Sequence, residues 1–164
     1  ELLIGLSEVF STEHLEEMAD MLVKGSSTDR AMGMVLVLLV APIAEELIFR
    51  GFVWDCFERE WGKNAAWLVS SFAFALYHFD PLHVVSVLPL SLLLGALRLR
   101  SGSIVPAIAA HFGNNLLAVV FLWKFGADEA MSVPSSVALI GLIVSLVILV
   151  AGCSFQSRPE NVRE

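Results

Sequence analysis

The sequence predicts an all-helical fold: a polytopic transmembrane helix bundle of about five spans that follows an amphipathic N-terminal helix. Two observations lead to this prediction. Hydrophobic residues make up 57% of the 164 residues and charged residues only 16%, and the mean hydropathy of +0.76 lies well outside the range of soluble globular domains. The apolar residues are also gathered in segments that approach or reach the length of a membrane-crossing helix.

Three regions are expected along the chain. Residues 1–30 form an amphipathic, interfacial N-terminal segment, residues 31–154 a transmembrane bundle that carries the site, and residues 155–164 a polar C-terminal tail. The chain begins at Glu1 rather than Met and lacks the features of a signal peptide, so we expect it to have lost upstream sequence.

The first predicted helix covers residues 11–24. Its apolar side chains fall at helical spacing and acidic side chains occupy the remaining positions: Leu15, Met18, Ala19, Leu22 and Val23 against Glu13, Glu16, Glu17 and Asp20. The acidic face argues against a lipid-binding basic helix. We expect this helix to lie at the interface or over the mouth of the bundle, as a surface element or as a gate. Residues 25–29 are predicted to be a loop.

Five apolar segments follow, over residues 31–54, 65–79, 84–97, 104–123 and 136–151. Pro42 is expected to kink or break the first span and to free backbone groups, which is tolerated at membrane depth only beside protein or a wet cavity. Residues 55–64 are predicted to be a polar turn, and Asp80-Pro81 ends the second span. His83 is expected in the short loop after Pro81, solvated and without a role.

The distribution of charged residues indicates membrane topology rather than a binding partner. The net charge of −7 comes largely from the first thirty residues and the tail, so no basic face is offered to nucleic acid. If all spans cross, Arg59, Lys63, Arg98, Arg100, Arg158 and Arg163 fall on one side and Lys24, Arg30 and Lys124 on the other. This bias predicts a cytoplasmic C-terminus. Cys56 and Cys153 are predicted to be free thiols.

The first span holds three charged residues, Glu45, Glu46 and Arg50. On insertion scales each costs about 2.5 to 3.5 kcal/mol near the bilayer centre, whereas about ten apolar residues return only about 5 kcal/mol. The charges must therefore face partners or water inside the bundle, which by default indicates a functional site. Glu46 precedes Arg50 by four residues, the favourable order for an ion pair, so Glu45 is left without a local cation and is the candidate general base.

Two further spans carry polar pairs at helical spacing, Phe74 with His78 and His111 with Asn115. The imidazoles could hold a water against Glu45, and the Asn115 amide could donate to a developing oxyanion. These parts suit hydrolysis of an acyl bond by an activated water. The alternative for each residue is structural, because intramembrane His and Asn side chains also bond neighbouring helices, and an ion pair can be purely structural.

The motifs resemble those of a known family. Residues 45–51, Glu-Glu-Leu-Ile-Phe-Arg-Gly, are similar to the Glu-Glu-x-x-x-Arg motif of the CAAX protease and bacteriocin-processing family, also called the Abi or type II CAAX prenyl endopeptidase family. Residues 74–78 are similar to its Phe-x-x-x-His motif and residues 111–115 to its His-x-x-x-Asn motif. All three occur in order, each on an apolar segment, although family members usually have more spans.

The resemblance implies an intramembrane endopeptidase that cuts near the C-terminus of a membrane-associated substrate, prenylated or not. It implies that Glu45 and His78 activate water, and that His111 and Asn115 form the oxyanion hole. No cofactor is expected. The implied partners are the substrate peptide and the lipid bilayer, and the implied location is the plasma membrane of a bacterium or archaeon.

Depth gives a check on this site. At about 1.5 Å per residue, Glu45 lies roughly 22 Å and His78 roughly 20 Å from the cytoplasmic helix ends. His111, counted from Ile104, is only about 10 Å deep and Asn115 about 16 Å. The fourth predicted helix must therefore start deeper, or tilt, for the site to close.

Three other functions remain open at this point. Glu45, His78 and His111 could form a zinc site with Glu46 as the base, although no His-Glu-x-x-His helix is present. A non-catalytic immunity factor or scaffold of the same fold is a second alternative. The third, a transporter with a carboxylate proton relay, lacks the duplicated halves expected of such a protein.

Overall fold

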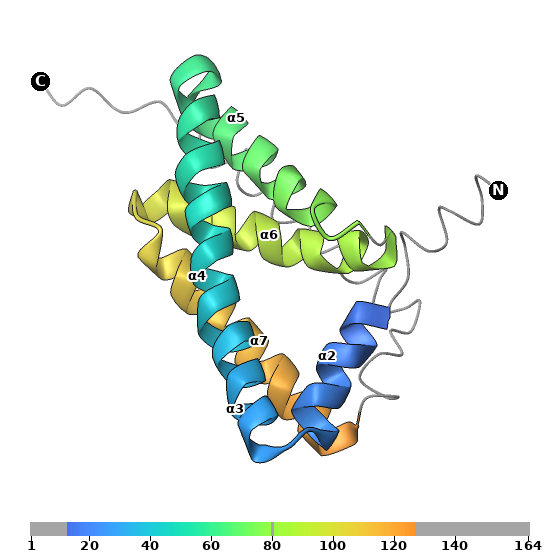
Figure 1. The fold of residues 1–164 in the computed structure, drawn as a ribbon. Coiled ribbons are helices and arrows are strands. Elements are labelled where there is room, and N and C mark those ends of the chain that lie inside the picture. The colour runs from blue at the N-terminus through green and yellow to red at the C-terminus, as the bar shows by residue number, and fades with distance from the viewer. Residues whose placement is uncertain (1–12, 80, 127–164) are drawn as a thin grey trace, which may run out of the picture.

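The computed structural model describes residues 13–79 and 81–126, and all regular structure within these ranges is helical (Figure 1). The predicted fifth span, residues 136–151, and the predicted tail, residues 155–164, lie outside the described residues. The all-helical prediction is therefore confirmed for the part of the chain that carries the three motifs.

The N-terminal part consists of α2 (Glu13–Lys24) and α3 (Ser27–Val35). The loop predicted through Asp29 is wrong, because Ser26 caps α3 directly. The Asp29 amide donates to Ser26 Oγ over 3.2 Å, and the Ser26 amide donates to the Asp29 carboxylate over 3.0 Å. This reciprocal capping box satisfies two amides that the first helical turn leaves open, so the connection shrinks to Gly25 and Ser26.

A long rod runs on from α3 without a break. It passes through η1 (Leu36–Val40), α4 (Ala41–Glu46) and η2 (Leu47–Val53) into α5 (Trp54–Leu76), and η1 and η2 are π-helical. The break expected at Pro42 does not occur. The wider π-helical turn just before Pro42 accommodates the proline, and the rod continues.

The rod ends where α5 reverses at Gly62, whose φ of 80° and ψ of 173° are not helical. Glycine tolerates this conformation because it has no Cβ. Most of the predicted polar turn over residues 55–64 is therefore helical, and the reversal is confined to its end. Figure 1 shows α5 turning at the upper end of the rod and descending beside it.

The last two described helices are α6 (Pro81–Ser101), which crosses the rod, and α7 (Val105–Phe125). The predicted span over residues 84–97 is longer at both ends than expected. Figure 1 shows the connection between α6 and α7 to one side of the rod, lower than the reversal of α5.

Two apolar clusters hold the helices together. Ala19 and Leu22 of α2 pack against Val119 and Leu122 of α7. In the second cluster, buried side chains of α5 pack against α6: Trp54, Ala66 and Trp67 with Leu92. The helices of this second cluster approach closely at Gly95, where there is no room for a side chain.

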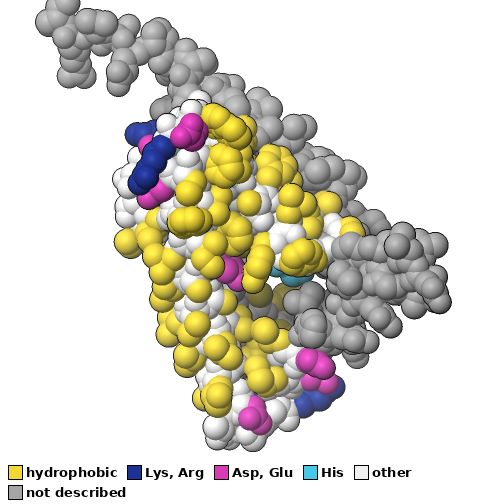
Figure 2. Space-filling model, turned by 45° about the horizontal axis from the view of Figure 1, so that its top comes forward, with side chains coloured by type: hydrophobic (Ala, Val, Ile, Leu, Met, Phe, Trp, Pro, Cys, Tyr) yellow, Lys and Arg dark blue, Asp and Glu magenta, His cyan; other side chains and the backbone are white. Residues whose placement is uncertain are grey.

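Three segments in the described part of the chain are long and apolar enough to cross a membrane: Ser27–Leu76, His83–Ser101 and Val105–Phe125. The first contains the Gly62 reversal, so it covers two of the predicted spans. On the face that Figure 2 shows, most of the charged side chains lie at two opposite ends, with a largely apolar band between them. Such a band is the surface that a bilayer covers.

The close approach of α5 and α6 at Gly95 can be tested by substitution. A Cβ there would lie 2.5 Å from Trp67 Cδ1 and 2.7 Å from Ser71 Oγ, so Gly95→Ala should lower the free energy of unfolding by about 1 to 3 kcal/mol. Gly113→Ala on α7 is the matched control, because nothing lies within 4 Å of its added Cβ. Thermal unfolding in detergent would measure both. Equal melting temperatures would contradict the packing.

Candidate functional site

A buried ion pair lies at the centre of the rod. Arg50 Nη1 lies 3.0 Å from Glu46 Oε1, and both side chains are fully excluded from the surface. Glu46 lies on α4 and Arg50 on η2, so the pair spans the start of the π-helical turn. This is the ion pair expected from their spacing of four residues.

Arg50 also joins the rod to two other helices. Its Nη2 donates to the backbone oxygen and to Oγ of Ser91 on α6, both over 2.8 Å. Its guanidinium carbon lies 4.5 Å from the centroid of the Phe74 ring on α5. Ser91 in turn donates from Oγ to the backbone oxygen of Ser71 on α5 over 2.8 Å. Arg50 is therefore both the counter-ion of Glu46 and a link between three helices.

His111 on α7 lies between the two glutamates. Its Nδ1 is 3.0 Å from Glu46 Oε1, and its Nε2 is 3.6 Å from Glu45 Oε2. The ring is almost fully buried and contacts Phe74 edge to face, with centroids 5.6 Å apart. The fourth predicted span thus reaches the carboxylates of the first span.

The two adjacent glutamates lie in different environments. The Glu45 side chain is 23% exposed whereas that of Glu46 is fully buried. Arg50 bonds Glu46 and not Glu45, while Nε2 of His111 lies 3.6 Å from Glu45 Oε2. Figure 2 shows an acidic side chain and a histidine at the edge of a hollow in the apolar face. Glu45 is therefore the carboxylate that can reach water.

His78 follows the C-terminal end of α5. Its Nδ1 lies 3.0 Å from the backbone oxygen of Phe74, one turn earlier. A neutral imidazole that donates from Nδ1 keeps Nε2 as an acceptor. The Phe74 ring packs against both His78 and His111, with centroids 5.1 Å and 5.6 Å away. Phe74 thus supports the two imidazoles from one side.

Asn115 bonds a carbonyl that Pro42 leaves open. Just before the proline, the Ala41 amide donates to the Leu36 oxygen five residues back, the π-helical register. The next bond in that register would join residue 42 to the Val37 oxygen, but proline has no amide hydrogen. Asn115 Nδ2 donates to the Val37 oxygen over 2.9 Å instead. An amide nitrogen carries two hydrogens, so a second donor remains.

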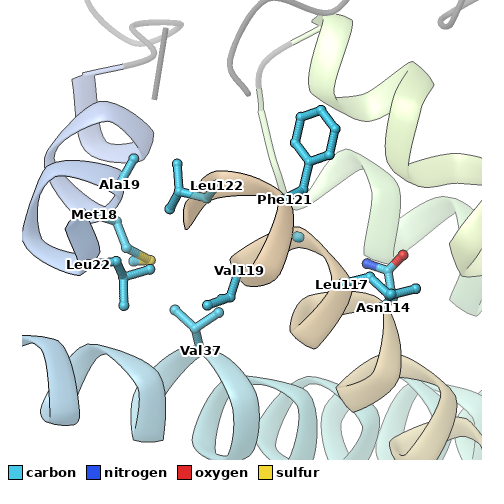
Figure 3. Close-up of a pocket in the computed structure, with 10 residues that line it drawn as sticks. Met18, Ala19, Leu22, Val37, Asn114, Leu117, Val119, Phe121 and Leu122 are labelled. Carbon is cyan, nitrogen blue, oxygen red and sulfur yellow. The ribbon is translucent and has the colours of Figure 1, made fainter. Parts of the chain in front are cut away.

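An apolar pocket of about 520 Å³ lies next to this bond, between α2, η1 and α7. Figure 3 shows Met18 and Leu22 facing Val119 across it, with Val37 below and Asn114 at one side. Val37 contributes its side chain to the pocket and its backbone oxygen to Asn115. The pocket is thus connected to the polar site through one residue.

Sequence reasoning missed His83 and the serine pair. His83 lies on the first turn of α6, not in a loop, and its ring stacks on that of His78 with centroids 4.8 Å apart and planes 12° apart. Pro81 starts α6, since its missing amide and fixed φ suit the first turn of a helix. Ser71 and Ser91 were detectable as polar residues within apolar spans, which bond neighbouring helices.

The residues of the alternative zinc site do not converge as metal ligands. Among residues 13–79 and 81–126, no group of three or more His, Cys, Asp or Glu side chains could hold a metal ion. His111 instead places one ring nitrogen toward each glutamate.

The fold and the site define a class, the polytopic helical membrane proteins with an ionisable site inside an apolar bundle. The chain belongs to the type II CAAX prenyl endopeptidase Rce1-like family, whose model matches residues 27–117. The matched region contains all three motifs, and the resemblance stated from them is confirmed. The protein is accordingly an integral membrane protein of an intramembrane protease family.

One curated relative is the UPF0177 protein YbdI of Lactococcus lactis subsp. lactis (strain IL1403). It is 30% identical over 88 residues, which cover 53% of this chain and 47% of the relative. The chain thus spans about half the length of the relative that it matches. No solved structure matches the chain.

The buried ion pair generates a second test. Arg50→Gln should lower the free energy of unfolding by about 3 to 5 kcal/mol, because it leaves the Glu46 charge buried without its partner. Glu46→Gln combined with Arg50→Gln should recover part of that loss. Arg59→Gln, an exposed charge on the same rod, is the control and should change little. A double variant no more stable than Arg50→Gln would contradict the coupling, as measured by thermal unfolding in detergent.

Proposed function

We propose that the chain is an intramembrane endopeptidase in which Glu45 and His78 activate a water molecule for attack on a peptide bond. The observation that supports this most is the contrast between the glutamates. Glu46 is neutralised by Arg50 and fully buried, whereas Glu45 is partly exposed and its Oε2 lies 3.6 Å from His111 Nε2. An accessible carboxylate beside imidazoles in an apolar bundle suits a general base. Family membership independently favours proteolysis.

In the first step, water held between Glu45 and His78 Nε2 loses a proton to the Glu45 carboxylate. The water oxygen then bonds to the scissile carbonyl carbon, whose oxygen takes up the negative charge. The remaining amide hydrogen of Asn115 and the His111 ring donate to this oxyanion. His111 can do so through Nε2 when that nitrogen carries a proton, while Nδ1 keeps its bond to Glu46.

In the second step, the tetrahedral intermediate collapses and the carbon–nitrogen bond breaks. The departing amine takes the proton that Glu45 accepted, so the carboxylate returns to its starting state. The products are a carboxylic acid and an amine, and one water is consumed. Glu46 and Arg50 take part in neither proton transfer. Their role is to hold His111 and the rod in place.

The substrate in this proposal is the C-terminal region of a membrane-associated peptide. The apolar pocket between α2 and α7 suits an aliphatic segment, and it adjoins the Val37 carbonyl that Asn115 bonds. A peptide lying there would bring its backbone toward Asn115. Prenylated and unprenylated peptides both fit this chemistry, and the assay below separates them.

We further propose that about five spans cross the plasma membrane of a bacterium or archaeon, with the C-terminus in the cytoplasm. Arg98 lies 3.8 Å from Asp55 near the reversal end of the rod, so the α6 terminus and that end share one side. Trp123 of α7 donates to the Leu22 oxygen of α2 over 3.2 Å at the other end. The basic residues near the reversal favour the cytoplasm, and α2 would lie at the opposite interface.

The water-activating pair is tested by two variants. Glu45→Gln and, separately, His78→Ala should each abolish cleavage of a quenched-fluorescent peptide library, half of it carrying a farnesylated cysteine, by detergent-purified protein. Both should fold as the wild type does, because neither side chain belongs to the Glu46–Arg50 pair. Glu60→Gln, exposed on the rod, is the control.

Each outcome of this assay supports or removes one part of the proposed mechanism. Cleavage retained in either variant removes that residue from the mechanism, and cleavage lost on adding a chelator to the wild type would restore the zinc alternative. No cleavage by the wild type would favour a non-catalytic membrane protein of the same fold. The half of the library that is cut identifies the substrate class.

The role of Asn115 as an oxyanion donor is tested by comparing its substitution with that of an adjacent residue. Asn115→Ala should lower kcat about 10²-fold to 10³-fold, the usual effect of removing one oxyanion donor. Leu116→Ala, at an exposed position one residue later and outside the pocket lining, should leave kcat nearly unchanged. Thermal unfolding would separate this effect from the lost bond to the Val37 oxygen. Equal kcat values for the two variants would exclude Asn115 as a donor.

A further inference from the structure

His78 lies just past the end of a helix. The regular part of α5 ends at Leu76, and the His78 amide donates to the Ala75 oxygen only three residues back, over 3.2 Å. Phe79 then adopts a φ of 57°, a left-handed conformation that is unfavourable for a bulky aromatic residue. Such a backbone persists where surrounding contacts impose it, often at functional sites.

The reversal at Phe79 brings α6 back over His78. The His83 ring on the first turn of α6 lies parallel to that of His78, with centroids 4.8 Å apart and planes 12° apart. The rings of Phe74 and Tyr77 contact His78 at interplanar angles of 56° and 82°. Of the ring contacts that His78 makes in the described part of the chain, the one with His83 is the parallel stack.

We propose that His83 is a positioning residue for His78. Its ring holds the His78 imidazole in the plane where Nδ1 donates to the Phe74 oxygen, so that Nε2 is presented to the water beside Glu45. The Nδ1 bond alone leaves the ring able to tilt about that contact, and a parallel ring against one face removes this freedom. The inference rests on the proposed function, because it assigns His78 the water-activating role.

The kinetics of two substitutions at His83 distinguish the effect of its flat ring from the effect of its other chemical properties. His83→Ala removes the stack and should lower kcat about tenfold to a hundredfold with little change in KM, since misplacing a catalytic group by about 1 Å has effects of this size. His83→Phe keeps a flat ring and should restore most of kcat. Leu93→Ala, with an exposed side chain on the same helix, is the control.

A second measurement needs no substrate. The chain has four histidines, so NMR of protein labelled with ¹⁵N-histidine in detergent can follow His78, assigned with His78→Gln. The wild type and His83→Phe should show one neutral form of His78 with the proton on Nδ1. His83→Ala should show exchange between the two neutral forms, because the tilted ring loses its bond to Phe74.

The outcomes distinguish this inference from the proposed function. Unchanged kcat and an unchanged His78 signal in His83→Ala would overturn the positioning role. Loss of kcat in His83→Phe as large as in His83→Ala would show that the ring face is not what matters, which also overturns it. If the wild type cleaves no peptide, the proposed function fails, and the NMR signal alone decides whether His83 holds His78.

Discussion

The ion pair of Glu46 and Arg50 is the interaction on which the rest of the structure depends. Two charges buried in an apolar bundle cost several kcal/mol each unless good partners surround them. Arg50 obtains them from Ser91 and from the face of Phe74, and Glu46 obtains a second partner in His111. The partners of this one buried pair thus bring α5, α6 and α7 to the same point on the rod, which is where the site forms.

The π-helical stretches and Pro42 interrupt the regular hydrogen bonding of the rod, and they provide bonding partners for other helices. Each π-helical stretch leaves a carbonyl that a partner on another helix bonds: Asn115 bonds the Val37 oxygen near Pro42, and Arg98 bonds the Arg50 oxygen over 3.2 Å. Open carbonyls are costly where water is scarce. The proline and the π-helical turns therefore specify where α6 and α7 dock, and π-helical turns are common at functional sites.

Neighbouring carboxylates can take opposite roles when their surroundings differ. Successive residues on a helix point about 100° apart, so Glu46 faces the interior while Glu45 remains partly exposed. One glutamate is held by a guanidinium and is fully buried, and the other is partly exposed beside the His111 imidazole. Water can therefore reach Glu45 and not Glu46. His111 contacts both, so it links the structural and the proposed chemical part of the site.

The sequence by itself determined the helical class, the membrane-spanning character and the family, because hydropathy and motif spacing are local properties. It also predicted the pairing of Glu46 with Arg50, whose partners lie one turn apart. Only the tertiary structure decided the partners from distant segments: Ser91 for Arg50, the Val37 oxygen for Asn115, and the ring of His83 on His78. Such contacts depend on how helices cross and reverse, and no spacing along one helix encodes that geometry.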